Sequence, residues 1–416
     1  MPARNIGRTL VFLQFFILTA PALSAYSVLA HEQLVDTLWD STFKPLILHR
    51  FPATTPDALV EAHAYAYGGA IIQDMGYYPF GSKFFSDLVH YVRSGDFVVA
   101  LLRDAQDANE YAFALGALGH YCSDNIGHPE AVNVVEPMLY RKVRREFGDR
   151  VTYEDNPGDH LKTEFGFDVL EVARGNYAPK SYHDFIGFKV SKPVLERAFA
   201  DTYSITIKDV FPDLDLALST YRHTVSAILP EMTKAAWAAK KDQIRRAHPG
   251  ITERRFIYNI SRSSYEKEWD GKYEKPGVGA RLLAFFFKIV PKVGPFKALG
   301  FKMTTPQGEV LFEKSFNDAV ARYRAYAAQV RSGTLRLPDT NFDTGQPTRQ
   351  GDYFMADNAY AKLLDKFADK QVAPSPQLRS NIVAFYRDPS QITDAKARAE
   401  LAALKQNTAV APVTAQ

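Results

Sequence analysis

The chain has 416 residues, of which 46% are hydrophobic and 23% charged, as in an ordinary globular protein, which excludes a disordered or collagen-like chain. Its 50 Lys and Arg residues against 47 Asp and Glu give a formal net charge of +3, too small for a protein that coats nucleic acid. The single cysteine, Cys122, excludes an intramolecular disulfide and a multi-cysteine zinc ribbon. Any metal site must therefore use His, Asp, Glu and backbone atoms.

The first 25 residues have the layout of a secretory signal peptide. Arg4 and Arg8 precede an apolar run over residues 10–20, and small residues follow it up to Ala25. We expect cleavage after Ala25, so that Tyr26 becomes the amino terminus of a protein exported to the periplasm or the extracellular space. An uncleaved anchor is the alternative, although the apolar run is short for a bilayer.

The rest of the chain has the pattern of an all-α protein. Apolar residues recur at helical spacing from Tyr26 onward and again between Phe84 and Val92, and alternation typical of strands is absent. Further helices are predicted at residues 104–128, 132–147, 158–174, 190–203, 214–240, 308–332 and 356–369. Residues 340–351, rich in Asp, Thr, Gly and Pro, are predicted to form a loop.

A charged stretch over residues 240–275 suggests a domain boundary. We expect a large amino-terminal domain over residues 26–245, a helical extension over 246–405 and a flexible tail over 406–416.

Ligand-type side chains recur at helical spacing in the second hundred residues. His120, Asp124 and His128 are four residues apart, so they share one face of a helix. His160 and Glu164 have the same spacing. Each pair alone could be an ordinary ion pair on a helix, and His128, which precedes a proline, could simply end its helix.

Three more polar residues stand out by their surroundings. Asp74 follows an apolar run, where a carboxylate without a partner would be costly. His90 lies on the edge of an apolar helical face, and His31 follows Tyr26 by five residues on the helix that Tyr26 opens. Taken singly, Asp74 and His90 are more often satisfied polar groups of a core than functional residues.

Taken in order, these residues resemble the trinuclear zinc site of the bacterial zinc-dependent phospholipase C family and its relatives, the S1/P1 nucleases. The residues that carry the resemblance are Tyr26, His31, Asp74, His90, His120, Asp124, His128, His160 and Glu164. Residues 62–79 and the stretch Phe-Ser-Asp-Leu-Val-His that ends at His90 are similar to the phospholipase C branch in particular. The resemblance implies a multi-helix phospholipase C/P1 nuclease-like domain.

The resemblance also implies how three zinc ions are held. The ligands would be Asp74, His90, His120 and Asp124 for one ion, His128, His160 and Glu164 for a second, and His31, Asp124 and backbone atoms of Tyr26 for the third. The family usually has a longer gap before the His at position 128, and a helix break at Gly127 would turn that side chain toward the second ion. By resemblance, Asp74 orients the attacking water or accepts its proton.

The expected reaction is metal-dependent hydrolysis of a phospholipid to diacylglycerol and a phosphorylated headgroup. A basic, Phe-rich segment from Val278 to Lys302 could lie on an anionic membrane, or it could form buried helices whose lysine stems extend to the surface.

Two other functions remain open. A nuclease or 3'-nucleotidase of the S1/P1 type would use the same metal ligands, with aromatic residues stacking on bases, although such nucleases are typically disulfide-bonded. The second alternative is an exported binding protein that keeps the ligands without catalysis.

Overall fold

The computed structural model describes residues 28–174, 188–225, 229–247, 249–253, 300–388, 390, 392 and 395–408. Within them every regular element is helical, and the single β contact is an isolated bridge between Thr340 and Pro347, so the all-α prediction is confirmed. The predicted signal segment, Tyr26, and all but the last three residues of the segment 278–302 lie outside the described residues. In the part that is described, no helix combines the length and the hydropathy needed to cross a membrane.

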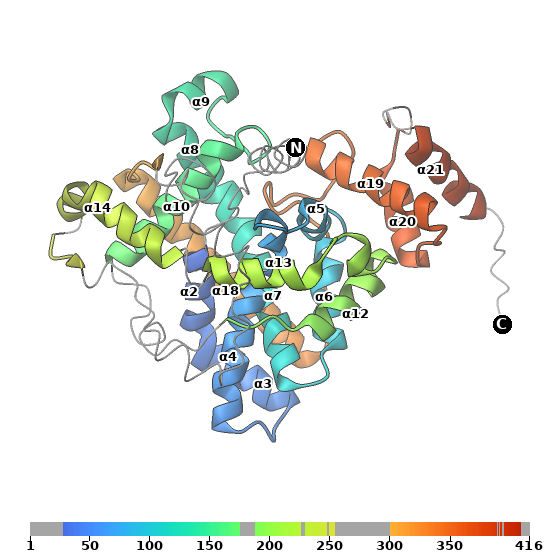
Figure 1. Ribbon diagram of the computed structural model, residues 1–416, viewed down its shortest axis with the longest axis horizontal. Coiled ribbons are helices and arrows are strands. Elements are labelled where there is room, and N and C mark those ends of the chain that lie inside the picture. The colour runs from blue at the N-terminus through green and yellow to red at the C-terminus, as the bar shows by residue number, and fades with distance from the viewer. Residues whose placement is uncertain are drawn as a thin grey trace, which may run out of the picture.

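The first half of the chain forms a bundle of helices joined by short connections (Figure 1). In chain order its elements are α2 (Val28–Leu38), η1 (Trp39–Phe43), α3 (Lys44–Arg50), α4 (Pro56–Ala70), η2 (Ile72–Tyr77), α5 (Lys83–Tyr91), α6 (Ser94–Asp104), α7 (Ala108–Gly127), η3 (His128–Val132), α8 (Asn133–Leu139), α9 (Arg141–Phe147) and α10 (Pro157–Arg174). The predicted helix 132–147 is thus divided at Tyr140, whose extended backbone separates α8 from α9.

In the second half, too, the regular elements of the described residues are helices. These are α12 (Lys192–Tyr203), η4 (Ile207–Asp209), α13 (Leu214–His223), α14 (Leu229–Ala247), α18 (Pro306–Ser332), α19 (Phe354–Lys370), α20 (Pro376–Phe385) and α21 (Ala395–Thr408). The predicted helices 308–332 and 356–369 correspond to α18 and α19 within two residues. Residues 340–351 form a loop between these two helices, as predicted.

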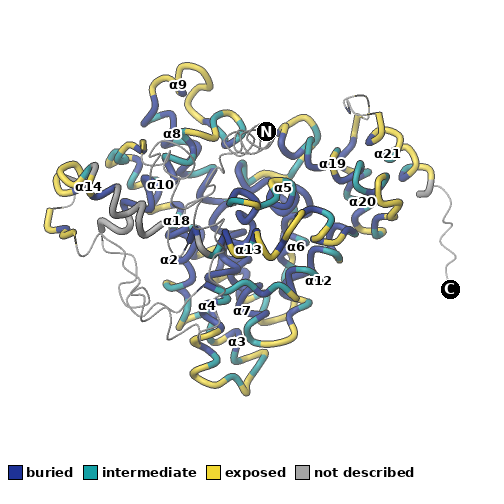
Figure 2. Tube along the Cα trace, in the orientation of Figure 1, coloured by how far each residue is buried: buried dark blue, intermediate teal, exposed yellow. Residues whose placement is uncertain are grey.

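Helix α7 is the central helix of the fold. It packs along α4 and α18 and also contacts α2, α3 and α6, and Figure 2 shows it within the buried interior, whereas α9 and α21 carry exposed faces. α4 and α7 touch backbone to backbone: a Cβ atom on Gly116 would lie 2.0 Å from the carbonyl oxygen of Ala66. Only glycine fits there, and the contact fixes the turn of α7 that carries His120.

The C-terminal helices pack on the same core. Tyr323 of α18 stacks on Phe43, with ring centroids 4.9 Å apart, and α19 packs against α5. The loop between α18 and α19 reaches the ligand-bearing helices, because the backbone N–H of Phe342 donates to the carbonyl oxygen of His90 at 3.2 Å.

Candidate metal centre

Four ligand-type side chains from three elements meet in the buried interior. Asp74 comes from η2, His90 from α5, and His120 and Asp124 from α7; their ligand atoms lie within 4.8 Å of one another. Nε2 of His120 lies 2.9 Å from Oδ2 of Asp124, and Nε2 of His90 lies 3.3 Å from Oδ1 of Asp74. The structure thus brings together the four residues that the sequence predicts for the first ion; we call them the first group.

The outer ring nitrogens of both histidines in the first group face carbonyl oxygens. Nδ1 of His90 is 2.8 Å from the carbonyl oxygen of Ser86, and Nδ1 of His120 is 2.9 Å from that of Ala70. Donation to a carbonyl requires the proton on Nδ1, which leaves the lone pair of Nε2 directed into the group. Metal-bound histidines usually have this arrangement.

His31 on α2 lies next to the first group. Its Nε2 is 3.4 Å from Oδ1 of Asp124, and its ring stacks on His120 with centroids 4.4 Å apart. Asp124 therefore directs Oδ2 to His120 and Oδ1 to His31, as a carboxylate between two ions would. Tyr26, the remaining residue predicted for this position, lies outside the described residues.

The start of α2 is held in place by Asp168 on α10. Its two carboxylate oxygens accept the backbone N–H groups of Leu29 and Ala30 at 3.2 Å each. These are free N–H groups of the first turn of the helix, which need acceptors. Asp168 thus fixes the helix that carries His31.

A second group forms around His128 and His160. Nδ1 of His128 lies 3.1 Å from Nε2 of His160. Oε1 of Glu164 is 3.0 Å from Nε2 of His160 and 3.9 Å from Nδ1 of His128. The structure therefore brings His128 to both residues that the sequence predicts beside it, and it adds the carboxylate of Asp343, whose Oδ1 is 3.3 Å from Nδ1 of His128.

His128 reaches this position through a widened helical turn. The expected break at Gly127 is wrong: its φ of −62° and ψ of −45° are helical, and the chain continues into the π-helical turn η3. Pro129 has no backbone N–H for a regular α-helical hydrogen bond, and a π turn is a common way to accommodate such a defect at a functional site. The same turn leaves Nε2 of His128 3.7 Å from Oδ1 of Asp124.

Two residues near the second group are missing from the sequence prediction. Glu136 on α8 is buried and places Oε2 3.3 Å from Nδ1 of His160, where a carboxylate orients a metal-bound imidazole. The sequence does contain an indication of its role, because Glu136 is a charged residue on the apolar face of a predicted helix, between Val132 and Leu139. Asp343 lies in a loop far along the chain, and no spacing connects it to the other ligands.

Several carboxylate oxygens that face the two groups receive no hydrogen bond from any described residue. They are Oδ1 of Asp74, both oxygens of Asp124, Oε1 of Glu164 and Oδ1 of Asp343. Buried carboxylate oxygens without partners are costly unless a cation neutralises them. Converging imidazole nitrogens and carboxylate oxygens are the donors that zinc takes in proteins. The residues present therefore fit zinc.

In both groups, burial and neighbouring charges shift the pKa values of the side chains in opposite directions. Burial would raise the pKa of Asp124, but neighbouring His120 and other imidazoles hold it well below its usual range. Burial raises the pKa of Asp74 and of Glu164, although the neighbouring imidazoles, His120 for Asp74 and His160 for Glu164, lower it. Burial, together with the charge of His120, lowers the pKa of His31 well below its usual value, whereas carboxylate neighbours raise the pKa of His90, His128 and His160 against the effect of burial.

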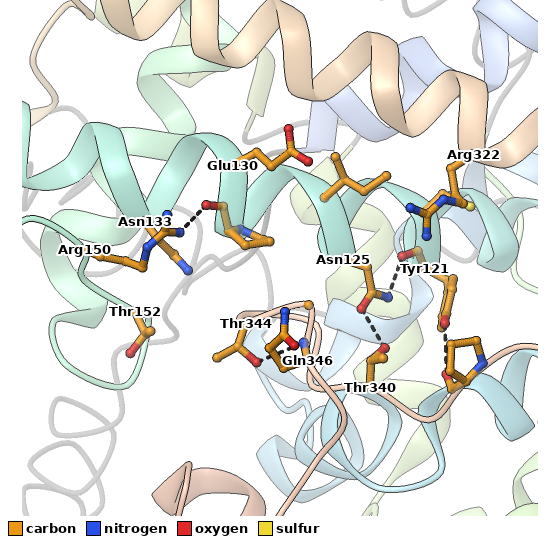
Figure 3. A pocket seen from close by; sticks show the side chains of 15 residues that line it. Tyr121, Asn125, Glu130, Asn133, Arg150, Thr152, Arg322, Thr340, Thr344 and Gln346 are labelled. Atoms are coloured by element: carbon orange, nitrogen blue, oxygen red, sulfur yellow. Dashed lines mark hydrogen bonds between the residues drawn. The ribbon is translucent and has the colours of Figure 1, made fainter.

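In the described part of the chain, two cavities lie against the loop between α18 and α19. The smaller, of about 10 Å³, is lined by Tyr77, His90, Tyr91, His128, Tyr153, Phe342 and Asp343. The larger, of about 630 Å³ (Figure 3), is lined by none of the predicted ligands. One of its walls is fastened by Asn125, which donates to the carbonyl oxygen of Tyr121 at 2.8 Å and accepts from the hydroxyl of Thr340 at 2.6 Å.

The part of the chain that contains most of these residues is similar to a known protein family. Residues 30–213 match the family model described as zinc dependent phospholipase C. The match covers His31 and every member of both groups except Asp343. No curated protein and no solved structure matches the chain.

Proposed function

Since residues 30–213 belong to the zinc-dependent phospholipase C family, a family of phosphoric diester hydrolases, we propose that the chain is an exported phospholipase C with three zinc ions. It hydrolyses a phospholipid to diacylglycerol and a phosphorylated headgroup. The observation that carries the proposal is the convergence of two buried groups of imidazoles and carboxylates, which Asp124 and His128 join to each other.

The zinc ions have defined candidate ligands. The proposed sets are Asp74, His90, His120 and Asp124 for the first ion, His128, His160 and Glu164 for the second, and His31, Asp124 and backbone atoms of Tyr26 for the third. The unpartnered oxygens of Asp124 support its place between two ions. When bound, zinc would supply water activated near neutral pH and positive charge for the phosphate.

The chain's own residues position water and substrate. Asp74 orients the attacking water or accepts its proton. The water oxygen attacks phosphorus, the bond between phosphorus and the glycerol oxygen breaks, and that oxygen takes up a proton. Buried Tyr77 and Tyr153 line the cavity beside the groups and limit the access of bulk water.

A parallel assay on two substrates tests the function. The purified protein is given phosphatidylcholine micelles or single-stranded DNA, each with a chelator and again after zinc is restored. We expect zinc-dependent release of diacylglycerol and phosphocholine. Hydrolysis of DNA alone would support the nuclease function instead, and activity on neither substrate in zinc-loaded protein would support a binding protein.

A pair of Asp→Asn variants connects the activity to the site. Asp74→Asn should lower turnover of phosphatidylcholine by about 10²-fold or more. Asp87→Asn is the matched control: Asp87 is also buried, but it faces Lys83, whose Nζ is 3.4 Å away. Equal activity in both variants would remove Asp74 from the mechanism.

Export and processing belong to the same proposal, because cleavage after Ala25 frees the amine of Tyr26. Sequencing the amino terminus of protein recovered from the periplasm or the medium should give Tyr26. Protein that retains residues 1–25 and still holds three zinc ions would contradict the role of Tyr26.

The segment 278–302 is proposed to contact the membrane. Its deletion should weaken binding to anionic phospholipid vesicles while zinc content stays unchanged. Unchanged vesicle binding would contradict this role.

A further inference from the structure

With Asp343, the second group has four ligand-type side chains, one more than a catalytic zinc normally uses. Such a zinc takes three protein ligands and leaves a position for water or substrate. His128, His160 and Glu164 already provide three. Asp343 adds a fourth, and it lies beyond residues 30–213, which match the family model.

The carboxylate of Asp343 is buried and fixed in orientation. Oδ2 accepts the backbone N–H of Tyr153 and the hydroxyl of Tyr353, at 2.9 Å each. Oδ1 has no hydrogen-bond partner among the described residues and points at the second group, 3.3 Å from Nδ1 of His128. One oxygen thus positions the side chain, and the other is available to a cation.

Backbone contacts join the two ends of the loop that carries Asp343. Thr340 and Pro347 form a β-bridge, and the backbone N–H of Asn341 donates to the carbonyl oxygen of Gln346 at 2.8 Å. The side-chain amide of Asn133 on α8 donates a hydrogen bond to the carbonyl oxygen of Asp343 at 2.7 Å. We call residues 340–347 the 340–347 loop.

The 340–347 loop also covers the first group. The ring of Phe342 lies with its centroid 5.1 Å from that of His90 and 6.0 Å from that of His120. The remaining cavity of about 10 Å³ has room for one water molecule, whereas a small-molecule site needs about 300 Å³ or more. A phospholipid headgroup therefore does not fit while the loop is in this position.

The same loop lines the large cavity. Thr340, Thr344, Gly345 and Gln346 contribute to the wall of the cavity of about 630 Å³ (Figure 3), whereas Phe342 and Asp343 line the small one. Displacement of the loop would therefore give the two metal groups access to a space of ligand size.

We propose that Asp343 is a displaceable fourth protein ligand of the second zinc, and that the 340–347 loop is a plug which the substrate phosphate must displace. In this exchange an oxygen of the anionic phosphodiester would replace the carboxylate oxygen of Asp343 at the cation, and no bond to carbon or phosphorus would change. The inference rests on the metal centre of the proposed function.

The variant Asp343→Asn separates ligation from loop structure. The amide oxygen can accept the hydrogen bonds from Tyr153 and Tyr353, which places the NH₂ group, a poor ligand, toward the metal. In Co²⁺-loaded protein, whose visible absorption reports coordination, we expect the spectrum of this variant to differ from that of the wild type. Inorganic phosphate should shift the variant's spectrum at a concentration at least tenfold lower.

Asp339→Asn is the matched control, since the same change is made four residues earlier. Oδ1 of Asp339 accepts the backbone N–H groups of Gly95 and Asp96 at 3.0 Å each, and an amide oxygen can do the same. We expect this control to behave like the wild type. An equal spectral change in the control, or none in Asp343→Asn, would overturn the proposal.

Two further measurements keep the test decisive. Wild-type protein that takes up no Co²⁺ or Zn²⁺ refutes the metal centre itself, whereas a metal-loaded wild type with an indistinguishable Asp343→Asn variant refutes only the role of Asp343. If Asp343→Asn does not fold, Tyr353→Phe removes one hydrogen bond to Oδ2 and keeps the carboxylate. It should strengthen phosphate binding several-fold, and unchanged binding would count against the plug.

Discussion

Nε2 of His128 lies 3.7 Å from Oδ1 of Asp124, so one imidazole touches both metal groups. Its other nitrogen faces His160 at 3.1 Å, and the same oxygen of Asp124 also faces His31 at 3.4 Å. The two groups are therefore one electrostatic unit, and the loss of a charge at their junction should affect more than one ion.

The junction predicts a large effect of Asp124→Asn. An amide has no negative charge and offers only one good ligand oxygen, so we expect more than one zinc ion per chain to be lost and turnover to fall by about 10²-fold or more. Elemental analysis and the phosphatidylcholine assay measure the two effects. Asp87→Asn controls for the loss of a buried carboxylate; an Asp124→Asn protein with full zinc content and activity would rule out the junction.

Glu136 predicts a selective effect on the second group. Its carboxylate orients His160 through Nδ1 at 3.3 Å, and removing such a partner typically costs 10–100-fold in metal affinity. Glu136→Ala should therefore release one zinc ion to a chelator about 10–100-fold more readily, while Glu136→Gln, which keeps an acceptor, should lose less. Release curves identical to the wild type in both variants would contradict this role.

The sequence was informative wherever ligands share a helix. His120 and Asp124 are one turn apart on α7, and His160 and Glu164 are one turn apart on α10, so the 3.6-residue period alone places each pair on one face. Asp74 was recognisable because a carboxylate beside an apolar run needs a partner.

Asp343 was not predictable by these arguments. It lies in an irregular loop, where no period relates one residue to another, and its place beside His128 results from the packing of α18 on α7 and of α19 on α5. The backbone conformation at His128 was predicted wrongly, as a helix break, for a related reason. The widening of the helix at Pro129 is a property of backbone hydrogen bonding, which the pattern of side chains does not encode.

The contact between α4 and α7 predicts that alanine destabilises the protein at one glycine of α7 and is tolerated at another. Gly116→Ala would place Cβ 2.0 Å from the backbone oxygen of Ala66, so the helices must separate, and we expect a loss of about 3 kcal/mol or more in the free energy of unfolding. Gly119→Ala would place Cβ 3.2 Å from Cδ2 of Leu34, a side-chain atom that can move, and 3.9 Å from Cε2 of Tyr323, an ordinary van der Waals distance. Because alanine favours a helix over glycine by about 1 kcal/mol, that variant should be as stable as the wild type in denaturant unfolding. Equal losses in both would mean that the helices do not touch at Gly116.

Asp339 predicts a pH-dependent contribution to stability away from the metal groups. Burial and the nearby charge of Asp96 raise the pKa of Asp339 to about 6, against about 3.9 in an unfolded chain. Between these values the folded chain binds more protons than the unfolded chain, so the contribution of Asp339 falls as the pH rises from about 4 to about 6.

Asp339→Asn should therefore be more stable than the wild type above pH 6, by at most about 3 kcal/mol, and the difference should vanish below about pH 4. The asparagine oxygen can still accept the N–H groups of Gly95 and Asp96, so the variant isolates the cost of the buried charge. Urea unfolding at pH 4, 5, 6 and 7 measures it, with Asp352→Asn, a change at an exposed carboxyl of the same segment, as the control for net charge. A difference that is the same at every pH would mean that Asp339 ionises as readily in the folded chain as in the unfolded one.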